Sequence, residues 1–74
     1  MKYPEFQRKV GQKIKSFRES TGITQEDMEF MDHDLQLTVR AYQEIERGKS
    51  NVTLKSLFII ARQLGIEPKD LLDV

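Results

Sequence analysis

Apolar residues at helical spacing are the feature that most constrains the fold of this chain. The clearest run lies between residues 54 and 64, and its members are Leu54, Leu57, Phe58, Ala61 and Leu64. Steps of three and four residues place these side chains, together with Ile60, on one face of an α-helix. Thr53 precedes the run as a helix cap, and Gly65 follows it as a stop. The pattern therefore predicts a helix that is buried along one side.

The N-terminal part of the chain predicts two more helices. The first covers residues 5–20 and ends at Thr21-Gly22, because glycine adopts positive φ without strain. The second covers residues 24–32, where Thr24 and Asp27 are spaced as a capping box. The inward-facing positions of these two helices are Phe6, Val10, Ile14, Phe17, Met28 and Met31.

A shorter helix is expected between Thr38 and Gly48, which serve as its cap and its stop. Ala41, Tyr42 and Ile45 form its inward strip, so Tyr42 is expected in the core. Its outward side chains are Arg40, Gln43, Glu44 and Arg47. A helix that reads the major groove of DNA has this form, and so does a surface helix of a small bundle.

A last short helix is expected to begin near Pro68, because proline fits the first turn of a helix. No strand pattern appears, so the expected fold class is all-α, with five helices joined by short turns. The chain of 74 residues is long enough for one small domain. We expect that domain to cover residues 1–74, with an N-terminal arm over 1–5 and a C-terminal helix and tail over 67–74.

The composition excludes several kinds of protein. The chain has no cysteine, which rules out disulfides and thiolate zinc sites and fits an intracellular protein. No apolar run approaches the roughly 20 residues that span a bilayer, and the N-terminus has no signal-peptide core. We therefore expect a cytoplasmic protein that does not act at a membrane.

Charge is distributed unevenly along a chain whose net charge is zero. Residues 1–18 hold six basic and one acidic side chain, residues 19–46 hold one basic and eight acidic, and residues 47–62 hold four basic and no acidic. A basic patch that suits nucleic acid can form if the two basic segments meet on one face. The alternative is that these charges are simply solvated helix faces.

The sequence offers little for catalysis or for a metal. The single histidine, His33, lies between Asp32 and Asp34 in a predicted turn, without a second histidine or a cysteine to complete a site. It has no evident serine or aspartate relay, and so small a domain offers little concave surface. We expect a protein that is not an enzyme and that holds no metal, cofactor or small-molecule ligand.

Taken together, these motifs resemble the Cro/cI-repressor type of helix-turn-helix domain, also called the XRE family. The resemblance covers roughly residues 10 to 72. The segments that carry it are Val10–Arg18, Gly22–Met28, Ile45–Lys49, Thr53–Leu57, Ile60-Ala61, Leu64–Ile66 and Leu71-Leu72. It implies a five-helix, lambda-repressor-like fold in which the second and third helices form a central helix-turn-helix. The third helix would then lie in the major groove.

The resemblance and the side-chain chemistry together suggest a role for each polar residue. The candidates for base reading are Arg40 for guanine, Gln43 for adenine and Glu44 for cytosine. The candidates for contacts with the DNA backbone are Gln25, Thr38, Arg47, Lys49, Ser50 and Asn51. Arg18 and Glu46 are similar to the family's buried ion pair, which ties the first helix to the third.

Three features depart from the family pattern. The turn from Asp32 to Gln36 is longer than usual, and Glu44 is acidic where a basic or neutral reader is usual. Glu29 occupies a position where the family has a small residue packed against the recognition helix. A charge there would clash in the usual register, so the second helix is expected to shift or rotate.

Surplus apolar residues near the C-terminus suggest a partner surface. We expect a homodimer whose interface includes Ile59, Leu71, Leu72 and Val74, although packing of the tail onto the preceding helix is the alternative. The predicted function is a sequence-specific regulator of transcription, acting as an autoregulatory repressor or controller on double-stranded DNA with a near-palindromic operator. Without a sensor domain, its activity would follow its own concentration. The competing hypothesis is a protein-interaction module on the same fold that has lost DNA binding.

Overall fold

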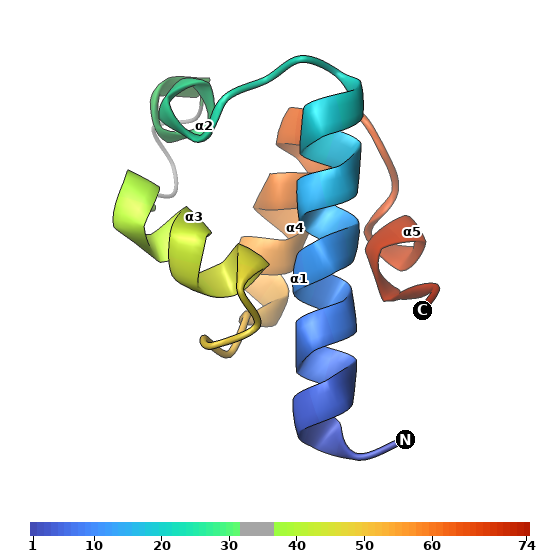
Figure 1. The fold of residues 1–74 in the computed structure, drawn as a ribbon. Helices are drawn as coiled ribbons and strands as arrows, with labels where there is room; N and C mark the ends of the chain where they lie inside the picture. The colour runs from blue at the N-terminus through green and yellow to red at the C-terminus, as the bar shows by residue number, and fades with distance from the viewer. Residues whose placement is uncertain (32–36) are drawn as a thin grey trace.

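The computed structural model describes residues 1–31 and 37–74 of the chain (Figure 1). Its helices are α1 (Tyr3–Ser20), α2 (Gln25–Met31), α3 (Val39–Glu46), α4 (Leu54–Leu64) and α5 (Pro68–Leu72). These two ranges contain no strand, so the predicted all-α fold with five helices is confirmed. None of the described helices is both long enough and apolar enough to cross a membrane.

Side-chain caps fix the beginning of several helices where the sequence predicts them. The hydroxyl oxygen of Thr38 accepts the backbone N–H of Ala41 at 3.1 Å, and that of Thr53 accepts the N–H of Ser56 at 3.0 Å. α1 begins at Tyr3, two residues earlier than predicted, because a proline is tolerated in the first turn. The expected N-terminal arm is shorter as a result.

The predicted capping box at the start of α2 is complete. Asp27 accepts the backbone N–H of Thr24, and the hydroxyl of Thr24 accepts the N–H of Asp27, both at 3.0 Å. The hydrogen bond from the Thr24 backbone, followed by the one from its side chain, lowers the pKa of Asp27. Since the folded protein favours the ionised form, this carboxylate stabilises the fold above its unfolded pKa.

That stabilisation is expected to disappear in acid. As the pH falls below about 4 and through the lowered pKa, Asp27 becomes protonated and its contribution is lost. Asp27→Asn is the matched control, because it keeps a carbonyl acceptor but does not titrate. Thermal unfolding followed by circular dichroism should show wild type more stable than this variant at neutral pH, with the difference shrinking in acid. A difference that stays constant with pH would contradict the assignment.

α1 lies between α3 and α5 in Figure 1 and packs against α3, α4 and α5, while α2 contacts α3. The apolar side chains at the centre belong to Val10, Ile14, Met28, Tyr42, Ile45, Leu57, Ile60, Ala61, Leu64 and Leu71. Tyr42 is fully buried, as predicted, and its hydroxyl donates to Gln63 at 2.9 Å. Among the described helices, none covers the side of α3 that carries the exposed Arg40 and Arg47.

The buried face of α4 differs from the predicted one. Leu54 and Phe58 are 84% and 55% exposed, whereas Ile59, the neighbour of Phe58, is only 3% exposed. Consecutive residues differ by about 100° around a helix axis, so turning Ile59 inward carries Phe58 to the edge of the packed face. Met31, at the end of α2, is also exposed rather than buried.

This packing overturns part of the predicted dimer surface. Ile59 and Leu71 are both buried within the protomer, so neither is a surplus apolar residue available to a partner. Leu71 belongs to the central cluster, where it joins α5 to the rest of the core. Of the four predicted interface residues, only Leu72 and Val74 are exposed, at 43% and 40%.

Candidate nucleic-acid interface

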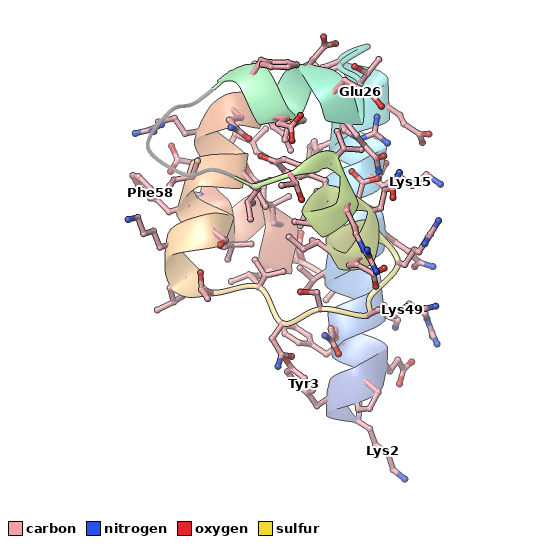
Figure 2. The ribbon with its side chains drawn as sticks, turned by 90° about the vertical axis from the view of Figure 1, so that its left-hand side faces the viewer. Lys2, Tyr3, Lys15, Glu26, Lys49 and Phe58 are labelled. Carbon is pink, nitrogen blue, oxygen red and sulfur yellow. The ribbon has the colours of Figure 1, made fainter. Side chains whose placement is uncertain are left out.

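One polar face of α3 is available to a ligand. Arg40, Gln43, Glu44 and Arg47 follow one another at steps of three, one and three residues, which places them on the same side of the helix. The two arginines are exposed, and Gln43 and Glu44 are half-buried. Figure 2 looks onto the side of the molecule where α3 lies in front. The predicted base-reading residues Arg40, Gln43 and Glu44 therefore share one face over about one turn, and Arg47 extends that face by about one more.

A part-buried ion pair fastens α3 to α1. Arg18 donates hydrogen bonds to both carboxylate oxygens of Glu46, from Nε to Oε2 at 2.7 Å and from Nη2 to Oε1 at 3.0 Å. Its Nη1 donates to the backbone carbonyl of Ile23 at 2.9 Å. The hydrogen bond to Glu46 raises the pKa of Arg18, which stays charged at all relevant pH values. This two-pronged geometry fixes the C-terminal turn of α3 on α1.

Gln25 joins the same network from the first residue of α2. Its side-chain nitrogen donates to Oε1 of Glu46 at 3.0 Å. The Glu46 carboxylate thus receives donors from both α1 and α2, which connects three helices at one point. The predicted contact of Gln25 with DNA backbone would have to use the remaining hydrogen-bonding capacity of its amide.

Glu29 occupies the space between α2 and the beginning of α3. Its Oε1 accepts the backbone N–H of Val39, the first residue of α3, at 3.2 Å. The carboxylate therefore has a hydrogen-bond partner in the place where the family pattern suggested a clash. The longer turn that accompanies it, from Asp32 to Gln36, lies outside the residues that the structure describes.

The loop after α3 is anchored to the N-terminal turns of α1. The Tyr3 hydroxyl and the Gln7 amide both donate to Oδ1 of Asn51, at 2.7 and 3.2 Å. Because its carbonyl oxygen is engaged, Asn51 keeps N–H groups that can donate to phosphate. Thr38 is similar, since its hydroxyl oxygen accepts the backbone N–H of Ala41 while its hydroxyl hydrogen can donate to phosphate. Tyr3 and Asn51 are 48 residues apart, and the sequence gave no indication that they are in contact.

The two basic segments of the chain meet at this loop. Gly48 has a φ of +74° and lies so close to α1 that an added Cβ would be 2.6 Å from the Cα of Arg8. Lys15 of α1 and Arg47 line one cleft of about 420 Å³. In Figure 2, Lys15 and Lys49 project on one side of α3, and Phe58 projects on the other. Lys15, Arg47 and Lys49 thus form the basic patch that the charge distribution predicted. Helical periodicity alone did not assign Lys15 to this patch.

The same cleft also contains acidic side chains. It lies between α1, the start of α2 and α3, and its acidic lining residues are Glu19, Glu26 and Glu46. Glu46 is neutralised by Arg18, which leaves Glu19 and Glu26 at the rim. In the part of the chain that the structure describes, no three His, Cys, Asp or Glu side chains are grouped to hold a metal ion. His33 and its two aspartate neighbours lie outside that part.

The sequence profile of a helix-turn-helix family matches residues 14–71. Control protein C.BamHI from Bacillus amyloliquefaciens is 42% identical over 64 residues, which is 85% of this chain and 75% of the relative. The crystal structure of the restriction-modification controller protein C.AhdI from Aeromonas hydrophila is similar, with a TM-score of 0.78 at 33% identity. That match covers 86% of this chain and 92% of the controller. The chain belongs to the XRE-type helix-turn-helix family.

A more distant structure supports the same fold. The DNA-binding domain of BldD has a TM-score of 0.81 at 22% identity, over 96% of this chain and 97% of that domain. Family membership makes the chain a DNA-binding transcriptional regulator, and family members of this kind are not enzymes. α2 and α3 are its helix-turn-helix.

Proposed function

We propose that this protein is a controller of restriction–modification genes that acts in the cytoplasm as a homodimer on near-palindromic double-stranded DNA. The observation that carries the proposal is its similarity, over most of both chains, to a control protein and to a restriction-modification controller. A two-fold dimer places two copies of α3 about one helical turn of DNA apart, which explains the expected near-palindrome.

Footprinting on the DNA upstream of its own gene and of neighbouring restriction and methylation genes tests the proposal. The expected result is a protected, near-palindromic segment at a promoter, with specific affinity at least about a thousandfold above that for random DNA. A transcription assay on the same DNA then separates activation from repression. Uniform binding along these fragments, without a protected segment, would argue against a controller of these genes.

Within this proposal, α3 enters the major groove with Arg40, Gln43 and Glu44 directed at base edges. Arginine offers a two-pronged donor to guanine, the amide of glutamine pairs with adenine, and a carboxylate accepts from cytosine. The DNA backbone would be held by Gln25, Thr38, Arg47, Lys49, Ser50 and Asn51. Within the described residues, the oxygens of Thr38 and Asn51 act as acceptors, so their hydrogens can donate to phosphate, which only accepts hydrogen bonds.

Two alanine variants should separate base reading from phosphate binding. Arg40→Ala is expected to weaken binding to the specific site by roughly 1–3 kcal/mol and to relax the preference at one base pair. Lys49→Ala, at an exposed loop position, should weaken binding to all sequences alike and reduce the salt slope by about one. Fluorescence titrations on specific and random DNA at several salt concentrations provide the comparison. Equal losses on every sequence for both variants would contradict the placement of α3.

The proposed dimer uses the surface around the end of α5 and the beginning of α1. Leu72 lines a small cavity of about 70 Å³ with Tyr3 and Phe6, and Tyr3 is itself 57% exposed. Val74 is exposed at the same end of the chain. This patch replaces the interface predicted from Ile59 and Leu71, because those two side chains are already buried.

Leu72→Asp should convert the dimer to a monomer without unfolding it. The side chain is half-exposed, so the new charge can remain in water in the monomer but not in the interface. Leu54→Asp is the matched control, because Leu54 is more exposed and does not line the cavity that Leu72 shares with Tyr3 and Phe6. Sedimentation at micromolar concentration should find a dimer for wild type and for the control, and a monomer for the Leu72 variant. A dimeric Leu72 variant would rule out this surface.

A further inference from the structure

The first turn of α3 is held by two acceptors, one from its own cap and one from another helix. The backbone N–H groups of a first turn have no partners within their own helix. Thr38, the cap of α3, accepts a hydrogen bond from the N–H of Ala41, and Glu29 of α2 accepts one from the N–H of Val39. The Thr38 contact is local and would move with α3. The Glu29 contact is different, because it ties the beginning of α3 to another element.

We infer that Glu29 is a positioning residue that sets the sequence specificity of DNA binding by fixing the N-terminal turn of α3 on α2. The inference rests on the proposed reading role of α3. Val39, which Glu29 holds, directly precedes Arg40, so a displacement of the Val39 backbone displaces the base of the Arg40 side chain. A two-pronged contact with guanine tolerates only about 0.5 Å of such displacement.

The contact at the other end of α3 explains why this hydrogen bond matters. Arg18 and Gln25 hold Glu46 in the last turn, and Tyr42 and Ile45 pack in the core, but none of these contacts holds the backbone of the first turn. Glu29 supplies a second fixed point at Val39, which lies about two turns before Glu46. Polar contacts at both ends of α3 fix its direction more tightly than core packing and the last-turn contact do without Glu29.

The charge of Glu29 has a separate and opposite effect on affinity. A carboxylate is stabilised at a helix N-terminus by the helix dipole, which favours the hydrogen bond to Val39. The same negative charge lies near the end of α3 that would approach DNA phosphates, and it weakens binding to every sequence alike. The acceptor and the charge can therefore be separated by substitution.

Two variants of similar size separate these effects. Glu29→Gln keeps a carbonyl oxygen for the Val39 N–H and removes the charge, whereas Glu29→Met removes both at nearly constant volume. Each is titrated against a selected specific site and against random DNA. We expect Glu29→Gln to keep the ratio of specific to random affinity within about twofold and to bind both DNAs more tightly. Glu29→Met should bind random DNA as tightly as Glu29→Gln does, but its ratio should fall by about tenfold, as expected for one lost hydrogen bond.

Hydrogen exchange of the Val39 amide in the free protein provides a readout that does not involve DNA. The amide should be protected in wild type and in Glu29→Gln and should exchange faster in Glu29→Met, while the amides of α1 and α4 stay protected in all three. The inference would be overturned if Glu29→Met kept the wild-type ratio of specific to random affinity, or if both variants lost that ratio equally. Neither outcome would contradict DNA binding by wild type. Wild type that prefers no sequence at all would overturn the proposed reading role together with the inference.

Discussion

Replacing Glu46 with alanine should destabilise the protein by roughly 3–5 kcal/mol, as expected when one partner of a buried ion pair is removed. The Arg18 side chain is only 11% exposed, and without Glu46 its Nε and Nη2 groups lose both acceptor oxygens. The amide of Gln25 loses its partner as well. Because a small domain has only about 5–15 kcal/mol of stability, the melting temperature should fall sharply. Urea and thermal unfolding followed by circular dichroism measure the change.

A double variant shows whether the stability lost in Glu46→Ala arises from the unpaired charge of Arg18. Arg18→Met combined with Glu46→Leu leaves no charge behind, and it should recover much of the stability that Glu46→Ala loses. The urea midpoints of wild type, single variant and double variant then form one series. If Glu46→Ala unfolded within about 0.5 kcal/mol of wild type, as surface substitutions do, the pair would not be what fastens α3 to α1.

Gly11→Ala should have the second large effect, because it forces α1 and α3 apart. A Cβ on Gly11 would meet the backbone carbonyl oxygen of Ile45 and would lie 3.0 Å from that of Glu46. Neither atom can move without moving α3. Overpacking of this kind costs about 1–3 kcal/mol, which exceeds the gain of up to about 1 kcal/mol from replacing a helical glycine. Specific DNA affinity should also fall, because the displaced helix is the one proposed to read bases.

Gly22→Ala is the control for this substitution. An added Cβ at Gly22 meets nothing within 4 Å, but its φ of +74° still makes alanine unfavourable by roughly 1–2 kcal/mol. We expect this variant to lose stability without losing the ratio of specific to random DNA affinity. The free energy of unfolding and the ratio of specific to random DNA affinity are measured for Gly11→Ala and for Gly22→Ala. A Gly11→Ala protein as stable as wild type, with the same specificity, would show that α3 is not held against α1 at this point.

Local features of the sequence predicted most of the helical framework. The caps at Thr38 and Thr53 and the capping box of Thr24 and Asp27 depend on neighbouring residues alone, so spacing revealed them. The rotation of α4 was less determined. Phe58 and Ile59 are both apolar and adjacent, so periodicity could not decide which one faces the core, and Ile59 was assigned to the dimer surface although it is buried in the protomer.

The contacts that orient the candidate site depend on tertiary approach. Tyr3 and Asn51 are 48 residues apart, and nothing in either segment indicates their hydrogen bond. Glu29 stood out only as a departure from the family pattern. The family pattern predicted a clash in the usual register, and it gave no sign that this carboxylate could accept the N–H at the start of α3.

Selection of bound sequences from randomised double-stranded DNA, with wild type and Arg40→Ala side by side, tests most directly whether α3 reads the sequence. Wild type should enrich a near-palindrome containing a guanine in each half-site, and Arg40→Ala should enrich the same pattern with the preference for that guanine lost. Recovery of an identical pattern by both proteins, or of no pattern by wild type, would contradict base reading by this face of α3.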